Sequence, residues 1–294
     1  MKYIHVGIDN EYKSINEAIK NNASPLYIYL DDEVYYEKVI VNKDNVTIDG
    51  LNKAKIVYDD YAIKIHEDGR EYVTFRTYTL LVKSNNVTLK NLIVENSAGE
   101  GHVVGQAVAL HLYGDNIHVI NCKLLAKQDT LFCGPLSDDL IDRYIDLLPD
   151  DERFYQGELH HYFTNCYIEG TVDFIFGGAS AIFKNCDIVS LPTRSDTYIV
   201  APNHHKDNNH GMIFENCRFI KHKDTKDKSV YLARPWRDYG FVTFKDCYLD
   251  SHIKEEGFSI WEGTDRHLHA RFIEINSTGP GSNNAKRISW SKVK

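Results

Sequence analysis

The sequence lacks a long apolar run. No stretch of its 294 residues approaches the roughly 18 consecutive apolar residues that a membrane-spanning helix needs. The opening segment, MKYIHVGIDNEYKS, also lacks the apolar core of a secretory signal. We therefore expect no membrane association. We favour a cytoplasmic location, with secretion after removal of a leader as the alternative.

An excess of positive charge is also missing. The chain has 34 basic and 42 acidic residues, which gives a formal net charge of −8. Nucleic acid is therefore not an expected partner, because phosphate binding favours a basic face. A densely charged anionic polymer would be repelled at long range, whereas a neutral, esterified polymer would be repelled less.

Metal-binding patterns are absent as well. None of the six cysteines forms a CxxC pair, so a zinc site is not expected. The two histidine pairs, His160–His161 and His204–His205, have no acidic or cysteine ligands at regular spacing. We expect no metal and no other cofactor.

What the chain does contain is a repeated cysteine context. Five cysteines follow Asn or Asp and precede an apolar residue by two positions, in NCKL (121–124), NCYI (165–168), NCDI (185–188), NCRF (216–219) and DCYL (246–249). Irregular repeats of short alternating strands are typical of a solenoid. We predict an all-β, right-handed parallel β-helix over residues 1–294, with cysteine in the interior and asparagine bonded to backbone at the turns.

One helix is expected near the N-terminus, around residues 14–22. Ser14 and Glu17 fit a capping box, and Ile15, Ala18 and Ile19 form an apolar stripe. Because the first coil of a solenoid has no preceding neighbour, we expect this helix to close the open end.

The same register brings two carboxylates together. Asp129 lies seven residues after Cys122, and Asp173 lies seven residues after Cys166. If the Asn-Cys pairs mark equal positions, these aspartates stack on neighbouring coils about 4.8 Å apart. Two carboxyl groups that close resist joint ionisation, so their pKa values separate into an acid and an ionised nucleophile or base.

A second spacing, counted back from the cysteines, suggests the position of Arg234. It precedes Cys247 by thirteen residues, as Asp173 precedes Cys186, and His204 takes the intermediate position. An arginine there would hold Asp173 ionised and orient it. Spacing alone leaves a structural ion pair equally open.

Four strings carry a family resemblance: QAVAL (106–110), QDTLF (128–132), GTVDFIFG (170–177) and LARPW (232–236). In order and spacing they resemble the pectin methylesterase family, and the similarity runs from about residue 10 to the C-terminus. The family usually has Tyr where Phe132 stands and Gly where Ala233 stands.

The resemblance implies a metal-free hydrolysis of pectin methyl esters through a covalent acyl-enzyme. Asp173 would attack the ester carbonyl, while Asp129 would protonate the departing methanol and then activate water. Gln106 and Gln128 would stabilise the oxyanion, and Arg234 would position Asp173. Adjacent residues of a regular strand face opposite sides, so Gln128 and Asp129 share one site only if the strand ends or bends there.

The resemblance also implies a substrate cleft, built on long loops, that binds pectin or methylated oligogalacturonides. We expect a monomer. The residues expected to line the cleft are Trp236, Phe132, Val172, Phe176, Trp261 and His111. The acidic insertion over 134–158 is either a packed surface excursion or a wall of this cleft.

Three other functions compete. An inverting polygalacturonase would also pair aspartates on a β-helix, with the carboxyl groups about 6.5–9.5 Å apart. A pectate lyase would need calcium, for which no clustered acidic loop is evident. The third alternative is a non-catalytic carbohydrate-binding β-helix.

Overall fold

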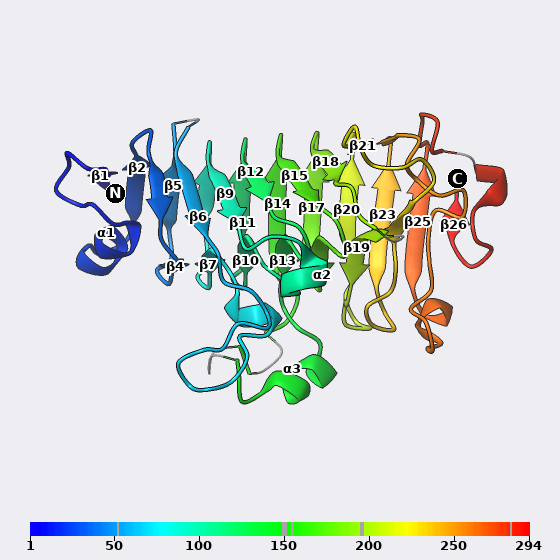
Figure 1. Ribbon diagram of the computed structural model, residues 1–294, viewed down its shortest axis with the longest axis horizontal. Helices are drawn as coiled ribbons and strands as arrows, with labels where there is room; N and C mark the ends of the chain where they lie inside the picture. The colour runs from blue at the N-terminus through cyan, green and yellow to red at the C-terminus, as the bar shows by residue number, and fades with distance from the viewer. Residues whose placement is uncertain (52, 149–151, 154–155, 195–196, 283) are drawn as a thin grey trace.

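The computed structural model describes residues 1–294 except 52, 149–151, 154–155, 195–196 and 283. Within the described residues, the strands form three sheets that run along an elongated molecule, with the two termini at opposite ends (Figure 1). The strand pairings inside each sheet are parallel. The parallel β-helix predicted from the sequence is confirmed.

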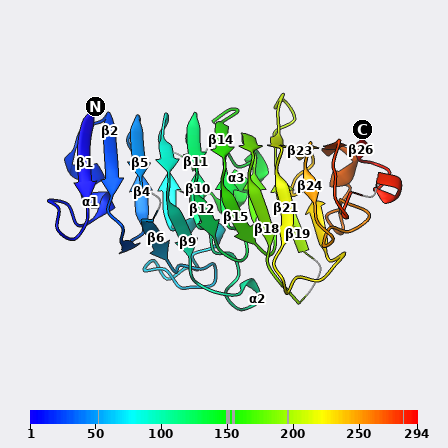
Figure 2. The same cartoon turned by 90° about the horizontal axis from the view of Figure 1, so that it is seen from above.

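Each sheet collects one strand from successive coils, as the rows seen from above illustrate (Figure 2). The eleven-stranded sheet contains β1 (Lys2–Val6), β2 (Leu26–Leu30), β5 (Val46–Asp49), β8 (Thr88–Lys90), β11 (Ile117–Ile120), β14 (His160–Thr164), β17 (Ser180–Lys184), β20 (Met212–Glu215), β23 (Phe241–Lys245), β25 (Arg271–Ile275) and β26 (Lys292–Val293). The seven-stranded sheet contains β4 (Val39–Val41), β7 (Leu80–Val82), β10 (Leu110–Leu112), β13 (Leu131–Cys133), β16 (Ile175–Gly177), β19 (Thr197–Pro202) and β22 (Val230–Ala233). The eight-stranded sheet contains β3 (Val34–Tyr36), β6 (Lys55–Tyr58), β9 (Ile93–Asn96), β12 (Lys123–Leu125), β15 (Tyr167–Gly170), β18 (Asp187–Ser190), β21 (Arg218–Lys221) and β24 (Tyr248–Leu249).

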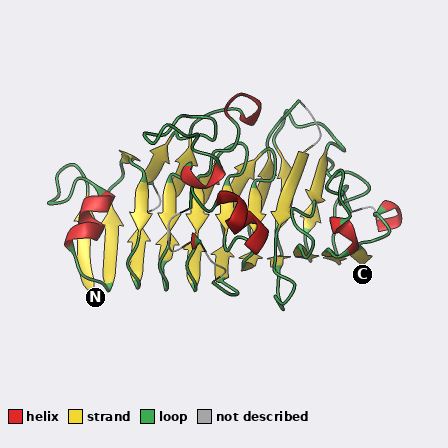
Figure 3. Cartoon of the chain, turned by 90° about the horizontal axis from the view of Figure 1, so that it is seen from below, coloured by secondary structure: helices red, strands yellow, loops and turns green. Residues whose placement is uncertain are grey.

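Helices are short and lie outside the sheets (Figure 3). In the described residues they are α1 (Ile15–Asn21), α2 (Gly101–Val104) and α3 (Asp138–Tyr144), with 3₁₀ turns η1 (Thr74–Arg76), η3 (Arg266–Leu268) and η4 (Asn284–Lys286). None of the helices in the described part of the chain is long and apolar enough to cross a bilayer. The location of the protein stays a prediction.

The interior is filled by repeated stacks of like side chains. Phe163, Phe183 and Phe214 lie on three neighbouring strands with ring centroids 4.4 Å apart at each step. The five cysteines of the repeated context are buried, and all six cysteines of the chain are free thiols. The predicted interior position of cysteine is therefore confirmed. Identical side chains stack because equal positions on successive coils are in register.

The asparagines of the repeat differ from the prediction. Asn121 and Asn165 have a left-handed backbone, with φ of 53° and 54°. Their side chains bond to one another between coils, since the Asn165 amide donates to Asn121 Oδ1 at 3.3 Å. The two side chains therefore bond to each other, whereas the sequence predicts bonds to backbone. Asn suits this turn because it tolerates φ > 0 better than other non-glycine residues.

The N-terminal helix is confirmed, with a change in its cap. Ile15, Ala18 and Ile19 are buried in the main core, and Ser14 Oγ accepts a bond from the Glu17 backbone N–H. The carboxylate that completes the cap belongs to Glu37 and not to Glu17. It accepts bonds from the backbone N–H groups of two residues in the first turn, Ile15 and Asn16, both at 2.9 Å.

Candidate active site

Asp129 and Asp173 occupy equivalent positions on neighbouring coils. The register of β13 with β16 pairs Leu131 with Ile175, and the Asp129 N–H donates to the Val172 carbonyl at 3.1 Å. Both aspartates have a left-handed backbone, with φ of 63° and 47°. This turn just before each strand interrupts the alternation of side chains. It provides the bend that Gln128 and Asp129 need if their side chains are to face the same site.

Arg234 contacts one member of this pair. Its guanidinium donates from Nε to Asp173 Oδ1 at 2.9 Å and from Nη2 to Oδ2 at 2.5 Å. The group is also held between two rings, 3.8 Å from the centroid of Tyr198 and 4.2 Å from that of Trp261. The bidentate contact and the stacking fix the orientation of Asp173.

The register proposed for Arg234 was wrong, although its contact was predicted correctly. β19 pairs Val200 with Ala233, which aligns Arg234 with Ala201 and Phe176 and leaves Asp173 three residues earlier. The Arg234 side chain therefore reaches back toward Asp173. His204, expected between them, is buried elsewhere and bonds the Ala179 carbonyl at 2.9 Å. Equal spacing from a cysteine does not give equal register here, because the loops between the strands differ in length.

The two carboxyl groups differ in their surroundings. Burial raises the pKa of Asp129 well above its usual range, the negative charge of Asp173 raises it further, and Arg234 and a hydrogen bond from Gln128 partly offset the rise. Burial also raises the pKa of Asp173, but the charge and hydrogen bonds of Arg234 lower it. Asp129 is thus the group that holds a proton, and Asp173 is the group that ionises first.

The two glutamines lie on the same edge of the seven-stranded sheet. The Ala107 N–H donates to the Gln128 carbonyl at 3.1 Å, which places Gln106 beside Gln128 on the preceding coil. Gly101 of α2 packs against the Gln128 side chain, where an added Cβ would lie 2.6 Å from Oε1. The Gln106 side chain is half-buried and makes no hydrogen bond within the described residues, so its amide is available to a ligand.

A model of the pectinesterase family matches residues 5–136 and 144–294. The chain belongs to the pectinesterase family. It is 32% identical to "Probable pectinesterase/pectinesterase inhibitor 58" of Arabidopsis thaliana over 97% of this chain and 47% of that protein, so it spans about half the length of that relative.

Solved pectin methylesterase structures share the fold. One, from Aspergillus niger, is 26% identical with a TM-score of 0.80, covering 98% of this chain and 89% of that one. Another pectin methylesterase, in complex with a hexasaccharide, is 24% identical with a TM-score of 0.79 and covers 100% and 93% of the two chains.

The two tryptophans expected in the cleft lie near Arg234 and Phe176. Trp261 covers the guanidinium of Arg234. Trp236 lies two residues after Arg234 in the sequence, and its ring centroid is 5.7 Å from that of Phe176. Val172 is half-buried between Thr171 and Asp173. Tyr198, on the other side of Arg234, was missed. It stands in register with Asp173, whose N–H donates to its carbonyl at 2.8 Å, but no motif of the sequence marks it.

Three expected cleft residues lie beneath the surface. His111, Phe132 and Phe176 form one outward row on the seven-stranded sheet, and their exposed fractions are 0%, 0% and 2%. The expectation that they contact substrate is wrong because other segments cover this row. The covering side chains are Phe75, Leu136, Leu140, Ile141 and Leu148.

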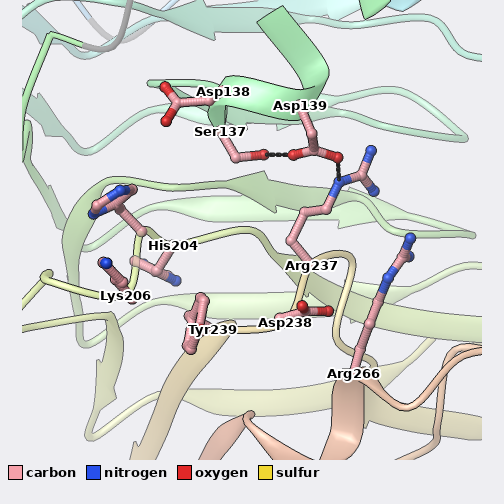
Figure 4. Close-up of a pocket in the computed structure, with 10 residues that line it drawn as sticks. Ser137, Asp138, Asp139, His204, Lys206, Arg237, Asp238, Tyr239 and Arg266 are labelled. Atoms are coloured by element: carbon pink, nitrogen blue, oxygen red, sulfur yellow. Dashed lines mark hydrogen bonds and ion pairs between the residues drawn. The ribbon is translucent and has the colours of Figure 1, made fainter. Parts of the chain in front are cut away.

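The described part of the insertion forms one of the two alternatives left open by the sequence, a packed surface excursion. The other alternative, a wall of the substrate cleft, stays a prediction. The insertion's apolar residues pack on the sheet, and its polar residues Ser137, Asp138 and Asp139 border a groove of about 460 Å³ that Arg237 and Arg266 also line (Figure 4). Asp139 pairs with Arg237 across this groove at 2.5 Å. Among the residues that the structure describes, no three His, Cys, Asp or Glu side chains gather as metal ligands would.

Proposed function

We propose that the protein hydrolyses the methyl esters of pectin or methylated oligogalacturonides, acting as a monomer without a metal or cofactor. The observation that carries the proposal is the asymmetry of the acidic pair. Arg234 binds Asp173 in a bidentate contact, while Asp129 is buried beside it with a strongly raised pKa. A pectin methylesterase with the same fold has been solved with a hexasaccharide, which supports this substrate class.

In the first step, an Asp173 carboxylate oxygen attacks the ester carbonyl. The negative charge moves to the carbonyl oxygen, where the amides of Gln106 and Gln128 donate hydrogen bonds. The carbon–methoxy bond breaks as Asp129 gives its proton to the methoxy oxygen, and methanol leaves. The products are an anhydride between Asp173 and the substrate, and an ionised Asp129.

In the second step, Asp129 takes a proton from water, and the oxygen of that water attacks the substrate carbonyl. The anhydride bond breaks, which restores ionised Asp173 and protonated Asp129 and releases the free acid. The neutral amides stabilise the developing charge without binding the substrate carboxylates tightly.

Methanol release from highly methylated pectin tests this proposal. We expect release without shortening of the chains, activity that survives dialysis against EDTA, and loss of activity by several orders of magnitude in Asp173→Ala. Chain shortening would indicate the polygalacturonase alternative, for which coils about 4.8 Å apart place the carboxyl groups unusually close. A strict calcium requirement would favour the lyase, and near-normal turnover by folded Asp173→Ala would remove the nucleophile from this role.

A further inference from the structure

The outer face of the first two strands of the eleven-stranded sheet carries a cluster of rings. Alternate residues of β1 and β2 are buried, and the outward residues between them are Tyr3, His5, Tyr27 and Tyr29. The parallel register sets Tyr3 beside Tyr27 and His5 beside Tyr29. The centroid distances are 5.6 Å for the first pair, 4.9 Å for the second and 4.6 Å between Tyr27 and Tyr29. These four rings, called the aromatic platform below, therefore form one continuous patch.

Tyr27 is held in place by polar neighbours. Its hydroxyl donates to Asp49 Oδ2 at 2.9 Å, and the Lys90 ammonium lies 5.2 Å from its ring centroid. Asp49 is buried and pairs with Lys90 at 3.2 Å, so this carboxylate leaves no uncompensated charge to repel an anionic polymer. A ring that is already fixed loses little freedom when a ligand covers it, so less binding free energy is lost to ordering.

The aromatic platform lies apart from the candidate active site. It belongs to the eleven-stranded sheet at the N-terminal end of the molecule, whereas Asp129 and Asp173 precede β13 and β16 of the seven-stranded sheet (Figure 1). In the eleven-stranded sheet, β5, β8 and β11 separate β2 from β14, the strand on the coil of β16. Four steps of about 4.8 Å place the two features roughly 19 Å apart along the axis. The platform is therefore no part of a cleft beside the acidic pair.

The chemistry of the platform suits a sugar polymer. The faces of the tyrosine rings are flat and apolar, as are the C–H faces of a pyranose, and their edges carry polar groups. The hydroxyls of Tyr3 and Tyr29 make no hydrogen bond within the described residues, so both are available to the hydroxyls of a sugar. Thr47 and Thr88 follow Tyr27 in register on the next two coils. An extended strand can therefore continue along the sheet without meeting a bulky side chain.

We propose that the aromatic platform is a second polysaccharide-binding surface, which holds the enzyme on one pectin strand while the acidic pair acts on another. The identity of the polymer rests on the proposed function. Because the rings contact the faces of the sugars, binding does not require the strand to be esterified. Attachment raises the local concentration of ester groups in a polymer network, and it gives no such advantage with short oligogalacturonides in solution.

The test measures retention of the protein during native electrophoresis through a gel that contains de-esterified polygalacturonate, at about 0.15 M salt to screen the net charge of the chain. We expect Tyr3→Ala and Tyr29→Ala each to weaken binding about two- to tenfold, as the loss of one stacked ring should. Tyr3→Phe keeps the ring and should bind almost as wild type does. In all three variants, kcat/KM for methanol release from a methylated hexagalacturonate should stay unchanged.

Tyr36→Ala is the matched control, because Tyr36 is as exposed as Tyr3, at 62%, but lies on the eight-stranded sheet at the same end of the molecule. Its retention should equal that of wild type. If Tyr29→Ala does not fold, the exposed position of Tyr3 decides the test.

Equal retention of wild type and folded Tyr3→Ala would overturn the inference, and so would sedimentation data showing that these rings join two copies of the chain. Failure of wild type to release methanol from the hexagalacturonate would instead overturn the proposed function, and the retention measurement would still test the platform.

Discussion

The left-handed backbone at Asp129 and Asp173 shapes the site at the scale of the residue. Such a φ is uncommon outside glycine, and aspartate tolerates it because its short polar side chain can bond locally. Conformations of this kind tend to occur where function requires a particular side-chain direction. Here the turn brings Gln128 and Asp129, which are neighbours in sequence, to the same side.

Asp129→Asn should be nearly inactive. Asparagine keeps the shape of the side chain but exchanges no proton, so neither methanol departure nor water attack is assisted. We expect kcat to fall about 10²- to 10⁴-fold, measured by methanol release. A normal rate in the folded variant would show that the proton comes from another group.

The same variant should be more stable than wild type at neutral pH. Burial and Asp173 raise the pKa of Asp129, so folding disfavours its charged form. The stability that this carboxyl contributes is therefore present below its unfolded pKa and is lost as pH rises through the folded pKa. Asparagine carries no charge, so the variant should melt about 2 °C higher at neutral pH and show no such advantage near pH 3. A pH-independent difference in melting temperature would contradict the raised pKa.

Arg234→Lys should lower kcat by about tenfold or more, because an ammonium group cannot reproduce a bidentate contact. It should also move the acidic limb of the pH–rate profile upward. The guanidinium lowers the pKa of Asp173, which must be ionised for the proposed attack, and a weaker partner lowers that pKa less. Because the carboxyl groups titrate as a pair, the profile reports two macroscopic values. Arg218→Lys makes the same change at the remote bidentate pair of Arg218 with Asp187 and should leave the profile unaltered.

At the scale of the element, short spacings between a repeated cysteine and a site residue predicted the register of the coils, and longer spacings did not. The segment from Cys122 to Asp129 has the same length as that from Cys166 to Asp173, so stacking followed directly from the sequence. The thirteen-residue offset of Arg234 failed because the loops beyond the seven-stranded sheet differ in length. The burial of His111 and Phe132 depends on the insertion folding back over their row, a long-range contact that no local pattern encodes.

The aromatic stack of the eleven-stranded sheet is expected to contribute strongly to stability. Phe183 is fully buried, with a phenylalanine ring 4.4 Å away on each side. Phe183→Ala should lower the free energy of unfolding by about 3–5 kcal/mol, measured by chemical denaturation. Phe241→Ala removes a half-buried ring on the outer face of the same sheet and should cost about 1 kcal/mol. Equal losses of unfolding free energy in the two variants would mean that a stacked ring contributes no more to stability than a partly exposed one.

At the scale of the whole molecule, the core contains reactive groups that the fold makes unreactive. All six cysteines are buried and free, and burial raises the pKa of the Cys122 thiol to about 12. We expect thiol titration of the denatured protein to find six free groups and titration of the native protein to find almost none, since the thiolate is the reactive form. Disulfides in the denatured protein would contradict this arrangement.

The place of the acidic pair along the axis has a consequence for partial unfolding. In a solenoid each coil contacts only its neighbours, so opening begins most readily at the two ends and spreads inward coil by coil. The candidate catalytic residues lie on coils between β10 and β22, with further coils on both sides. Amide hydrogen exchange should therefore be fastest in β1 and β26 and slowest near β13 and β16. The terminal coils thus protect the site from fraying, and the protein can open transiently at its ends without losing its catalytic geometry.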